Sequence, residues 1–194
     1  MGDQRVVGYV DAHKLNLLAA VMPTGPSGAA AAGGGPMRDS DLRVPPHSDE
    51  WMGLALDEAR RACGWGDVPV GAVVLDSEGA VLGLGRNERE LRRDPTAHAE
   101  VIAIRAAAQA RGDWHLEGCT LVVTLEPCVL CAGAILAARI ERVVFGAWDE
   151  KAGASGSVHD LLRDRRHNHV VEVYPGVRAE ESSRLLLDFF ASRR

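Results

Sequence analysis

From residue 95 onwards, short apolar runs alternate with stretches of helical periodicity, and this alternation constrains the fold more than any other feature. The apolar runs at 121–125, 143–145 and 170–173 have the length of buried strands. Helical spacing occupies 97–111, the stretch from Pro127 to about Ala138, and 179–192. Strands joined through helices pair in parallel, and the helices cover the sheet. The sequence therefore predicts an α/β fold.

The preceding segment, 48–84, predicts one helix and a hairpin. Ser48 is a good N-cap residue, followed by acidic residues in the first turn and then by apolar residues at helical spacing. We expect Gly64 and Gly66 to end this helix. The runs 70–75 and 80–84 flank a turn formed by Asp76-Ser-Glu-Gly79, which is typical of an antiparallel hairpin.

The composition of the chain changes near residue 47. Residues 1–47 contain the run Gly28-Ala-Ala-Ala-Ala-Gly-Gly-Gly35 and scattered prolines, so they bury little apolar surface. We interpret 1–47 as a disordered low-complexity extension and 48–194 as the folded domain. A signal peptide is the alternative, but an acid beside the single early base and the interruption at Lys14 argue against it. We expect a chain that begins near Pro46 to fold and to be active.

Size, charge and cysteine content exclude several classes of protein. No run reaches the ~18 apolar residues of a membrane span, which excludes an integral membrane protein. The net charge of −5 argues against a general polyanion binder, although it allows local basic patches. Four cysteines in 194 residues are too sparse for a secreted disulfide scaffold, which favours a reducing cytoplasm. The candidates for phosphate contacts are Arg163, Arg165, Arg166, Arg193 and Arg194.

Two short motifs carry the chemistry, and each lies at a predicted helix start. The first is His98-Ala99-Glu100, and the second is Pro127-Cys128-Val129-Leu130-Cys131. Cysteines at i and i+3 can face one point, and one imidazole with two thiolates is a ligand set for zinc. A catalytic zinc keeps three protein ligands and an open position, where the pKa of a bound water falls to ~7. We predict His98, Cys128 and Cys131 as the ligands and Glu100 as a proton shuttle.

The remaining cysteines and histidines leave one alternative open. Cys63 and Cys119 lack a paired spacing, so we interpret them as small buried apolar residues. A fourth protein ligand, Cys119 or His115, would instead indicate a structural zinc site in a protein without enzymatic activity.

The order of the two motifs, H-x-E before P-C-x-x-C, is the signature described for zinc deaminases. Over residues 50–194, the chain resembles the bacterial tRNA-specific adenosine deaminases of the cytidine deaminase superfamily. The resemblance rests on Asn87 and on longer motifs: Val68-Pro-Val-Gly-Ala72, Asp94-Pro-Thr-Ala-His-Ala-Glu100, Thr124-Leu-Glu-Pro-Cys-Val-Leu-Cys-Ala-Gly-Ala134, Arg142-Val-Val-Phe-Gly-Ala147, Gly156-Ser157 and Phe189-Phe190.

The resemblance implies a three-layer α/β/α fold around a five-stranded mixed sheet, with 48–194 as a zinc-dependent deaminase domain. It implies one zinc per chain and a homodimer. The implied reaction is the hydrolysis of adenosine to inosine at the wobble position of a tRNA, with arginine tRNA expected, bound through the anticodon stem-loop. Asn87 would bind the flipped nucleotide, and Asp149 would lie near the RNA, as would the loop that contains His167 and His169.

The chain departs from the family pattern beside Asn87, where Glu88 and Arg89 replace an expected basic residue and proline. Val170 follows Asn168-His169, where arginine is common. These departures concern RNA contacts rather than the chemistry. The alternative function is a free nucleobase or nucleoside deaminase of the guanine or cytosine type, which would share every zinc ligand.

Overall fold

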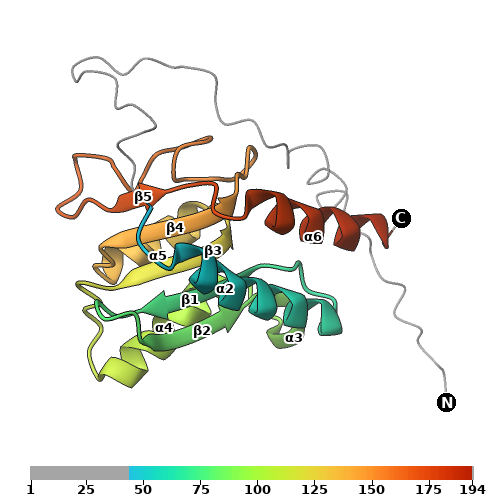
Figure 1. Cartoon of the computed structure of the whole chain (residues 1–194), viewed down its shortest axis with the longest axis horizontal. Coiled ribbons are helices and arrows are strands. Elements are labelled where there is room, and N and C mark those ends of the chain that lie inside the picture. The colour runs from blue at the N-terminus through green and yellow to red at the C-terminus, as the bar shows by residue number, and fades with distance from the viewer. Residues whose placement is uncertain (1–43, 194) are drawn as a thin grey trace.

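The structure, a computed structural model that describes residues 44–193, is built on a five-stranded mixed sheet (Figure 1). The strands are β1 (Gly71–Leu75), β2 (Val81–Arg86), β3 (Thr120–Leu125), β4 (Arg142–Ala147) and β5 (Glu172–Tyr174), in the order β2-β1-β3-β4-β5. β1 pairs antiparallel with β2 and β3, whereas β3, β4 and β5 pair in parallel. The predicted α/β class is confirmed, as are the antiparallel hairpin of β1 and β2 and the parallel pairing of β3, β4 and β5.

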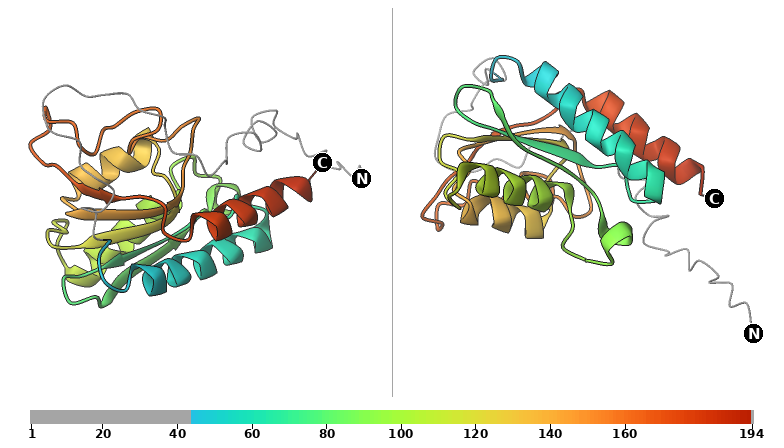
Figure 2. Two further views of the ribbon diagram at one scale, coloured as in Figure 1. Left: turned by 45° about the horizontal axis from the view of Figure 1, so that its top comes forward. Right: turned by 90° about the horizontal axis from the view of Figure 1, so that it is seen from below.

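Helices cover both faces of this sheet (Figure 2). α2 (Ser48–Ala62) and α6 (Ala179–Ala191) lie on one face, and α4 (Ala99–Arg111) and α5 (Val129–Ala137) lie on the other. A 3₁₀ turn, η3 (Cys63–Trp65), follows α2, and the short helix α3 (Arg89–Arg92) follows β2. The arrangement confirms the expected three layers. Within residues 44–193, no helix has both the length and the apolar character needed to cross a bilayer.

Alternate residues of the central strands enter two separate cores. In β1, Ala72 and Val74 pack with the layer of α4 and α5, whereas Val73 and Leu75 pack against α2. The same alternation holds in β3, β4 and their neighbours, because successive side chains of a strand point to opposite faces. A strand that is buried on both faces reads as a continuous apolar run, which explains the pattern at 121–125.

Two glycines of β2 bring the start of α4 onto the sheet. A Cβ at Gly85 would lie 2.1 Å from the carbonyl oxygen of Ala99, and one at Gly83 would lie 2.4 Å from that of Ala103. Both carbonyls belong to the backbone, so no side-chain movement could relieve the overlap. Glycine at these positions therefore fixes where the first turn of α4, and with it His98, stands relative to the sheet.

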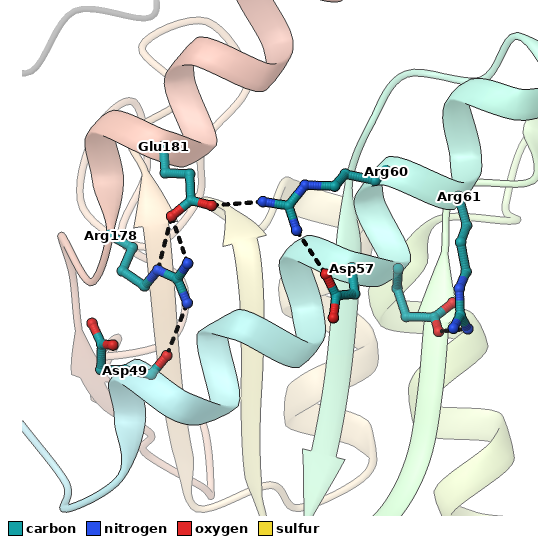
Figure 3. A network of polar contacts seen from close by, with 7 residues as sticks. Asp49, Asp57, Arg60, Arg61, Arg178 and Glu181 are labelled. Carbon is teal, nitrogen blue, oxygen red and sulfur yellow. Dashed lines mark hydrogen bonds and ion pairs between the residues drawn. The ribbon is translucent and has the colours of Figure 1, made fainter.

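On the opposite face, polar contacts join α2 to α6 (Figure 3). Arg60 donates to Asp57 within α2 and to Glu181 of α6, at 2.7 and 2.6 Å. Arg178 donates to Glu181 and, at 3.3 Å, to the carbonyl oxygen of Asp49. These side chains are substantially exposed, so each ion pair adds at most about 1 kcal/mol to stability. The apolar cluster that α2 and α6 share with the sheet therefore contributes more to the stability of this layer than the ion pairs do.

Several local predictions need correction. Ser48 is the first residue of α2, and His47 is its N-cap; the Ser48 hydroxyl donates back to the carbonyl oxygen of Pro45 and does not cap the helix. Cys63 is exposed, not buried: α2 ends at Ala62, so Cys63 leaves the apolar face of the helix. Helix α3 was not predicted, since its four residues carry no apolar periodicity.

The element boundaries otherwise agree with the predictions to within two residues. The last strand, for example, begins at Glu172 instead of residue 170. The predicted extension over 1–47 lies almost entirely outside the described residues. Its disorder and dispensability, and hence the domain boundary at residue 48, stay predictions.

Candidate active site and metal centre

One edge of the sheet collects the residues that the two motifs predict. β3 and β4 are parallel and both end at this edge, and β2 ends there too because it runs antiparallel to β1. A cavity of about 320 Å³ opens at the edge. Its lining includes His98, Glu100 and Cys128, together with Asn87 and Asp149. Tertiary structure thus brings residues from four separate segments to one cavity.

His98, Cys128 and Cys131 converge beside this cavity. His98 and Cys128 are the N-cap residues of α4 and α5, and both have an extended backbone, while Cys131 lies in the first turn of α5. The Nδ1 atom of His98 lies 3.7 Å from the Sγ atom of Cys128 and 3.4 Å from that of Cys131. All three ligand atoms lie within 4.8 Å of one another.

These distances fit a zinc ion. Ligand nitrogen and sulfur atoms at ordinary zinc distances stand about 3.6 Å apart around a tetrahedral ion. Among residues 44–193, this is the one group of three or more metal-ligating side chains. The alternative fourth ligands are engaged elsewhere: Cys119 accepts from Arg111 at 3.3 Å, and His115 contacts Asp113 at 3.0 Å. Three ligands leave a fourth position open, as in catalytic zinc sites.

The protonation of the three ligands reflects their mutual contacts. A hydrogen bond from Cys131, assisted by His98, lowers the pKa of Cys128 to about 4. The same hydrogen bond, together with burial, raises the pKa of Cys131. The contact with Cys128 raises the pKa of His98. The site thus stabilises one negative sulfur and a positive imidazole, and a bound dication would take over the role of that positive charge.

Glu100 lies two residues beyond His98, in the first turn of α4. Its side chain lines the cavity, and the residue is only 4% exposed. Burial raises the pKa of Glu100 to about 7. Glu100 does not belong to the group of metal-ligating side chains, although it lies at the same cavity. Its position suits a group that exchanges protons with a bound substrate.

Asn87 ties together three segments around the cavity. Its side-chain oxygen accepts a hydrogen bond from the backbone N–H of Ala99 at 3.1 Å, and its side-chain nitrogen donates to the carbonyl oxygen of Val68 at 3.1 Å. The first bond satisfies an N–H at the start of α4, where helices lack an internal acceptor. Asn87 therefore supports the position of His98 in addition to lining the cavity.

Glu126 is a buried residue of the cavity wall that the sequence analysis missed. It is 2% exposed, and its carboxylate accepts three backbone N–H bonds, from Asp149, Ser155 and Ser157, at 2.9–3.1 Å. It therefore holds the loop 149–157 against the segment that carries Cys128. In the sequence, Glu126 is marked only by its position directly after a predicted buried strand. That position alone does not show whether the carboxylate is buried or solvated.

We expect Glu126→Gln to lower the free energy of unfolding by about 1–3 kcal/mol. The amide that replaces one carboxylate oxygen is a donor and would face another N–H donor of the loop. Urea unfolding would measure the loss, with Glu150→Gln, an exposed acid of the same loop, as the matched control. If the urea concentration at the midpoint of unfolding were the same for Glu126→Gln as for the wild type, these hydrogen bonds would not stabilise the fold.

Of the other predicted contact residues, Asp149 lines the cavity; it is buried, and its carboxylate accepts from the backbone N–H groups of Lys151 and Ala152. The predicted arginines within residues 44–193 do not line the cavity. Arg163 and Arg166 form ion pairs with Asp160 and Asp164. In the loop predicted to lie near RNA, His169 contacts the carbonyl oxygen of Ile140.

Comparison with known proteins identifies the family. The sequence profile of the cytidine and deoxycytidylate deaminase zinc-binding region matches residues 46–147. A tRNA-specific adenosine deaminase of Bacillus subtilis is 46% identical over 144 residues, which cover 74% of this chain and 89% of that protein. A tRNA(Ile)-lysidine synthase of Deinococcus deserti is 51% identical over 146 residues, 75% of this chain, but the match spans only 27% of that protein's length.

Solved structures agree with this assignment. A tRNA:A34 deaminase that edits A to I at the wobble position of transfer RNA is 42% identical, with a TM-score of 0.68 over 71% of this chain and 99% of that chain. A guanine deaminase from Nitrosomonas europaea is 22% identical, with a TM-score of 0.63 over 76% of this chain and 94% of that one, which shows a shared fold. The chain therefore belongs to the zinc-binding cytidine and deoxycytidylate deaminase family, in its tRNA-specific adenosine deaminase branch.

Proposed function

We propose that this protein deaminates adenosine to inosine at the wobble position of a tRNA. The observation that carries the proposal is the cavity in which Glu100 lies beside the three zinc ligands His98, Cys128 and Cys131. Three ligands fit a catalytic site rather than a structural one. The relatives that match over most of their own length are tRNA-specific adenosine deaminases, which supports RNA as the substrate.

The residues divide the chemistry as follows. His98, Cys128 and Cys131 hold the zinc, which when bound supplies the Lewis acidity that lowers the pKa of a water to about 7. Hydrolysis replaces the amino group at C6 of adenine by an oxygen from water and releases ammonia. Glu100 carries one proton of that water to N1 of the ring and the other to the departing amino nitrogen. Both protons are thereby accounted for, and Glu100 ends the cycle as it began.

Asn87 is proposed to orient the nucleotide. Val68 occupies one of the two N–H bonds of its amide group, so the other N–H remains for an acceptor on the substrate. Because the Asn87 side chain also accepts from Ala99, any contact it makes with the nucleotide is rigidly placed relative to His98. Its assignment as a binding residue therefore has a geometric basis as well as the family resemblance.

The substrate is proposed to be the anticodon stem-loop, in particular that of an arginine tRNA. A base stacked in a helix would have to be extruded at a cost of a few kcal/mol, which is least in a single-stranded loop. A single adenine offers few contacts, whereas each flanking unstacked base adds stacking worth about 1–3 kcal/mol. Binding energy from these neighbours can position C6, so a truncated substrate should lose rate as well as affinity.

We also propose a cytoplasmic homodimer. The structural feature that supports a dimer is the exposed side of α5. It includes Val129 and Leu130, which are 52% and 43% exposed, and the small residues Gly133 and Ala137 follow at helical spacing. An apolar helix side with small residues suits close packing against a second copy of the chain. Location in the cytoplasm follows from where tRNA is used.

The experiment that tests the proposed function compares initial rates on an anticodon stem-loop with a wobble adenosine, on free adenosine and on free guanine. We expect conversion of the stem-loop to be faster by at least a hundredfold, because remote contacts contribute to the transition state. Raising the salt concentration should weaken binding of the stem-loop. A free base that turns over as fast as the stem-loop would overturn the RNA assignment and favour a nucleobase deaminase.

A further inference from the structure

The mouth of the cavity carries two basic side chains that the proposed chemistry does not use. Arg89 and Lys151 both line the cavity and both are exposed. Within the described part of the chain, neither side chain forms a hydrogen bond or an ion pair. Other arginines of the same region do: Arg86 pairs with Glu58 and Glu88, and Arg92 pairs with Glu88.

Three acids near these two cations already have other partners. Both oxygens of Glu126 accept backbone N–H bonds, and Asp149 accepts from the backbone of Lys151 and Ala152. Glu88, the neighbour of Arg89 in sequence, is 5% exposed and is paired with Arg86 and Arg92. Arg89 and Lys151 therefore have no ion-pair partner among these three acids, and both can bind an anion from outside the protein.

The sheet places the two cations on opposite sides of the cavity. Arg89 follows β2 and Lys151 follows β4, and the strand order β2-β1-β3-β4 puts β1 and β3 between them. The ends of these two middle strands form the floor, where Val70 and Leu125 line the cavity. A ligand seated over the floor would therefore have one basic side chain on each side.

The backbone at Arg89 is also fixed by hydrogen bonds to its neighbours in the same helix. The carboxylate of Asp67, a residue that is 1% exposed, accepts from the backbone N–H groups of Glu90 and Leu91 at 2.9 and 3.2 Å. These bonds anchor α3, whose first residue is Arg89. A guanidinium on an anchored backbone loses less entropy on binding and presents a planar pair of donors that matches a phosphate.

We infer that Arg89 and Lys151 bind the phosphodiester groups on the two sides of the target nucleotide. A nucleotide within an RNA strand carries one phosphodiester at its 5′ side and another at its 3′ side, which matches two cations that flank one cavity. This inference rests on the proposed function, because it takes RNA as the ligand. It adds the two residues that seat the backbone while the base reaches the metal centre.

The test uses stem-loops in which a single neutral methylphosphonate replaces the phosphodiester on one side of the wobble adenosine. Arg89→Ala and Lys151→Ala are compared with Arg105→Ala, an exposed arginine of α4 that does not line the cavity. On the unmodified stem-loop we expect each cavity variant to weaken binding and kcat/KM by about ten- to a hundredfold, and Arg105→Ala to change neither.

The modified stem-loops assign each cation to its phosphate. With the neutral linkage on one side, the effect of one cavity variant should shrink to less than about threefold while the other keeps its full effect, and the opposite linkage should reverse the pattern. Each cavity variant should also reduce the salt dependence of binding by roughly one ion. Binding losses that persist unchanged with both neutral linkages, or that equal those of Arg105→Ala, would overturn the inference.

Binding and turnover separate the two proposals. Fluorescence anisotropy measures binding of the labelled stem-loop independently of chemistry. Weakened binding confined to Arg89→Ala and Lys151→Ala would support the phosphate contacts even if the wild-type protein left the wobble adenosine unconverted, a result that overturns the proposed function alone. Conversely, full wild-type turnover with equal activity in all three variants would remove the phosphate contacts and leave the proposed function standing.

Discussion

Replacing Glu100 by glutamine is expected to lower the deamination rate by about 10²–10⁴-fold while the bound zinc is retained. Glutamine has nearly the size and shape of a protonated glutamate side chain and can also form hydrogen bonds. It cannot, however, accept a proton from water and pass it to the purine. The carboxyl group lies in the cavity and stands outside the group of three metal-ligating side chains, so the metal should not depend on it.

The measurement pairs single-turnover rates on the stem-loop with zinc content by mass spectrometry. Glu78→Gln is the matched control, because Glu78 lies in the turn between β1 and β2, at the edge of the sheet opposite the cavity. If Glu100→Gln lost its zinc, Glu100 would be a ligand or a support for one, and the assignment as proton shuttle would be wrong.

The second large effect is expected at the metal ligands. Cys128→Ser should lower zinc affinity by more than a hundredfold, because removal of a direct ligand exceeds the 10–100-fold effect of losing a supporting residue. Activity should fall in parallel. The melting temperature of the wild-type protein should drop when a chelator removes the metal, since a ligand that binds only the folded state stabilises it.

Cys63→Ser is the control for this substitution, because Cys63 is exposed and lies outside the metal group. Its zinc content and melting temperature should match those of the wild type. Cys128→Ser with a full complement of zinc and normal activity would remove Cys128 from the site and contradict the three-ligand centre.

The metal centre was predictable because its parts are local. The spacing of Cys128 and Cys131 places both sulfurs near one point on the first turn of a helix, whatever the rest of the fold does. His98 and Glu100 are likewise brought to one helix start by their separation of two residues. The structure then adds what spacing cannot supply: the N-cap of α4 and the N-cap of α5 lie side by side, with His98 3.7 Å from Cys128.

The order of strands and helices was also predictable from the sequence, because the periodicity of each element depends on residues that are close in sequence. Alternate burial of Val73 and Val74 on two faces leaves a continuous apolar run, and the turn at Asp76 closes through that residue's own side chain. The exposure of Cys63 was not predictable, since it depends on α2 ending one residue earlier than the apolar spacing suggests.

By itself, the sequence determined the α/β class, the hairpin, the candidate zinc ligands and the acid beside them, since each depends on residues close together in the chain. Only the tertiary structure decided which other charged residues border the cavity. It places Arg89, Lys151 and Glu126 there and engages Arg163 and Arg166 in ion pairs elsewhere. The physical reason is that a cavity wall is assembled from the ends of several strands, and the order of strands in a sheet comes from long-range packing that local spacing does not encode.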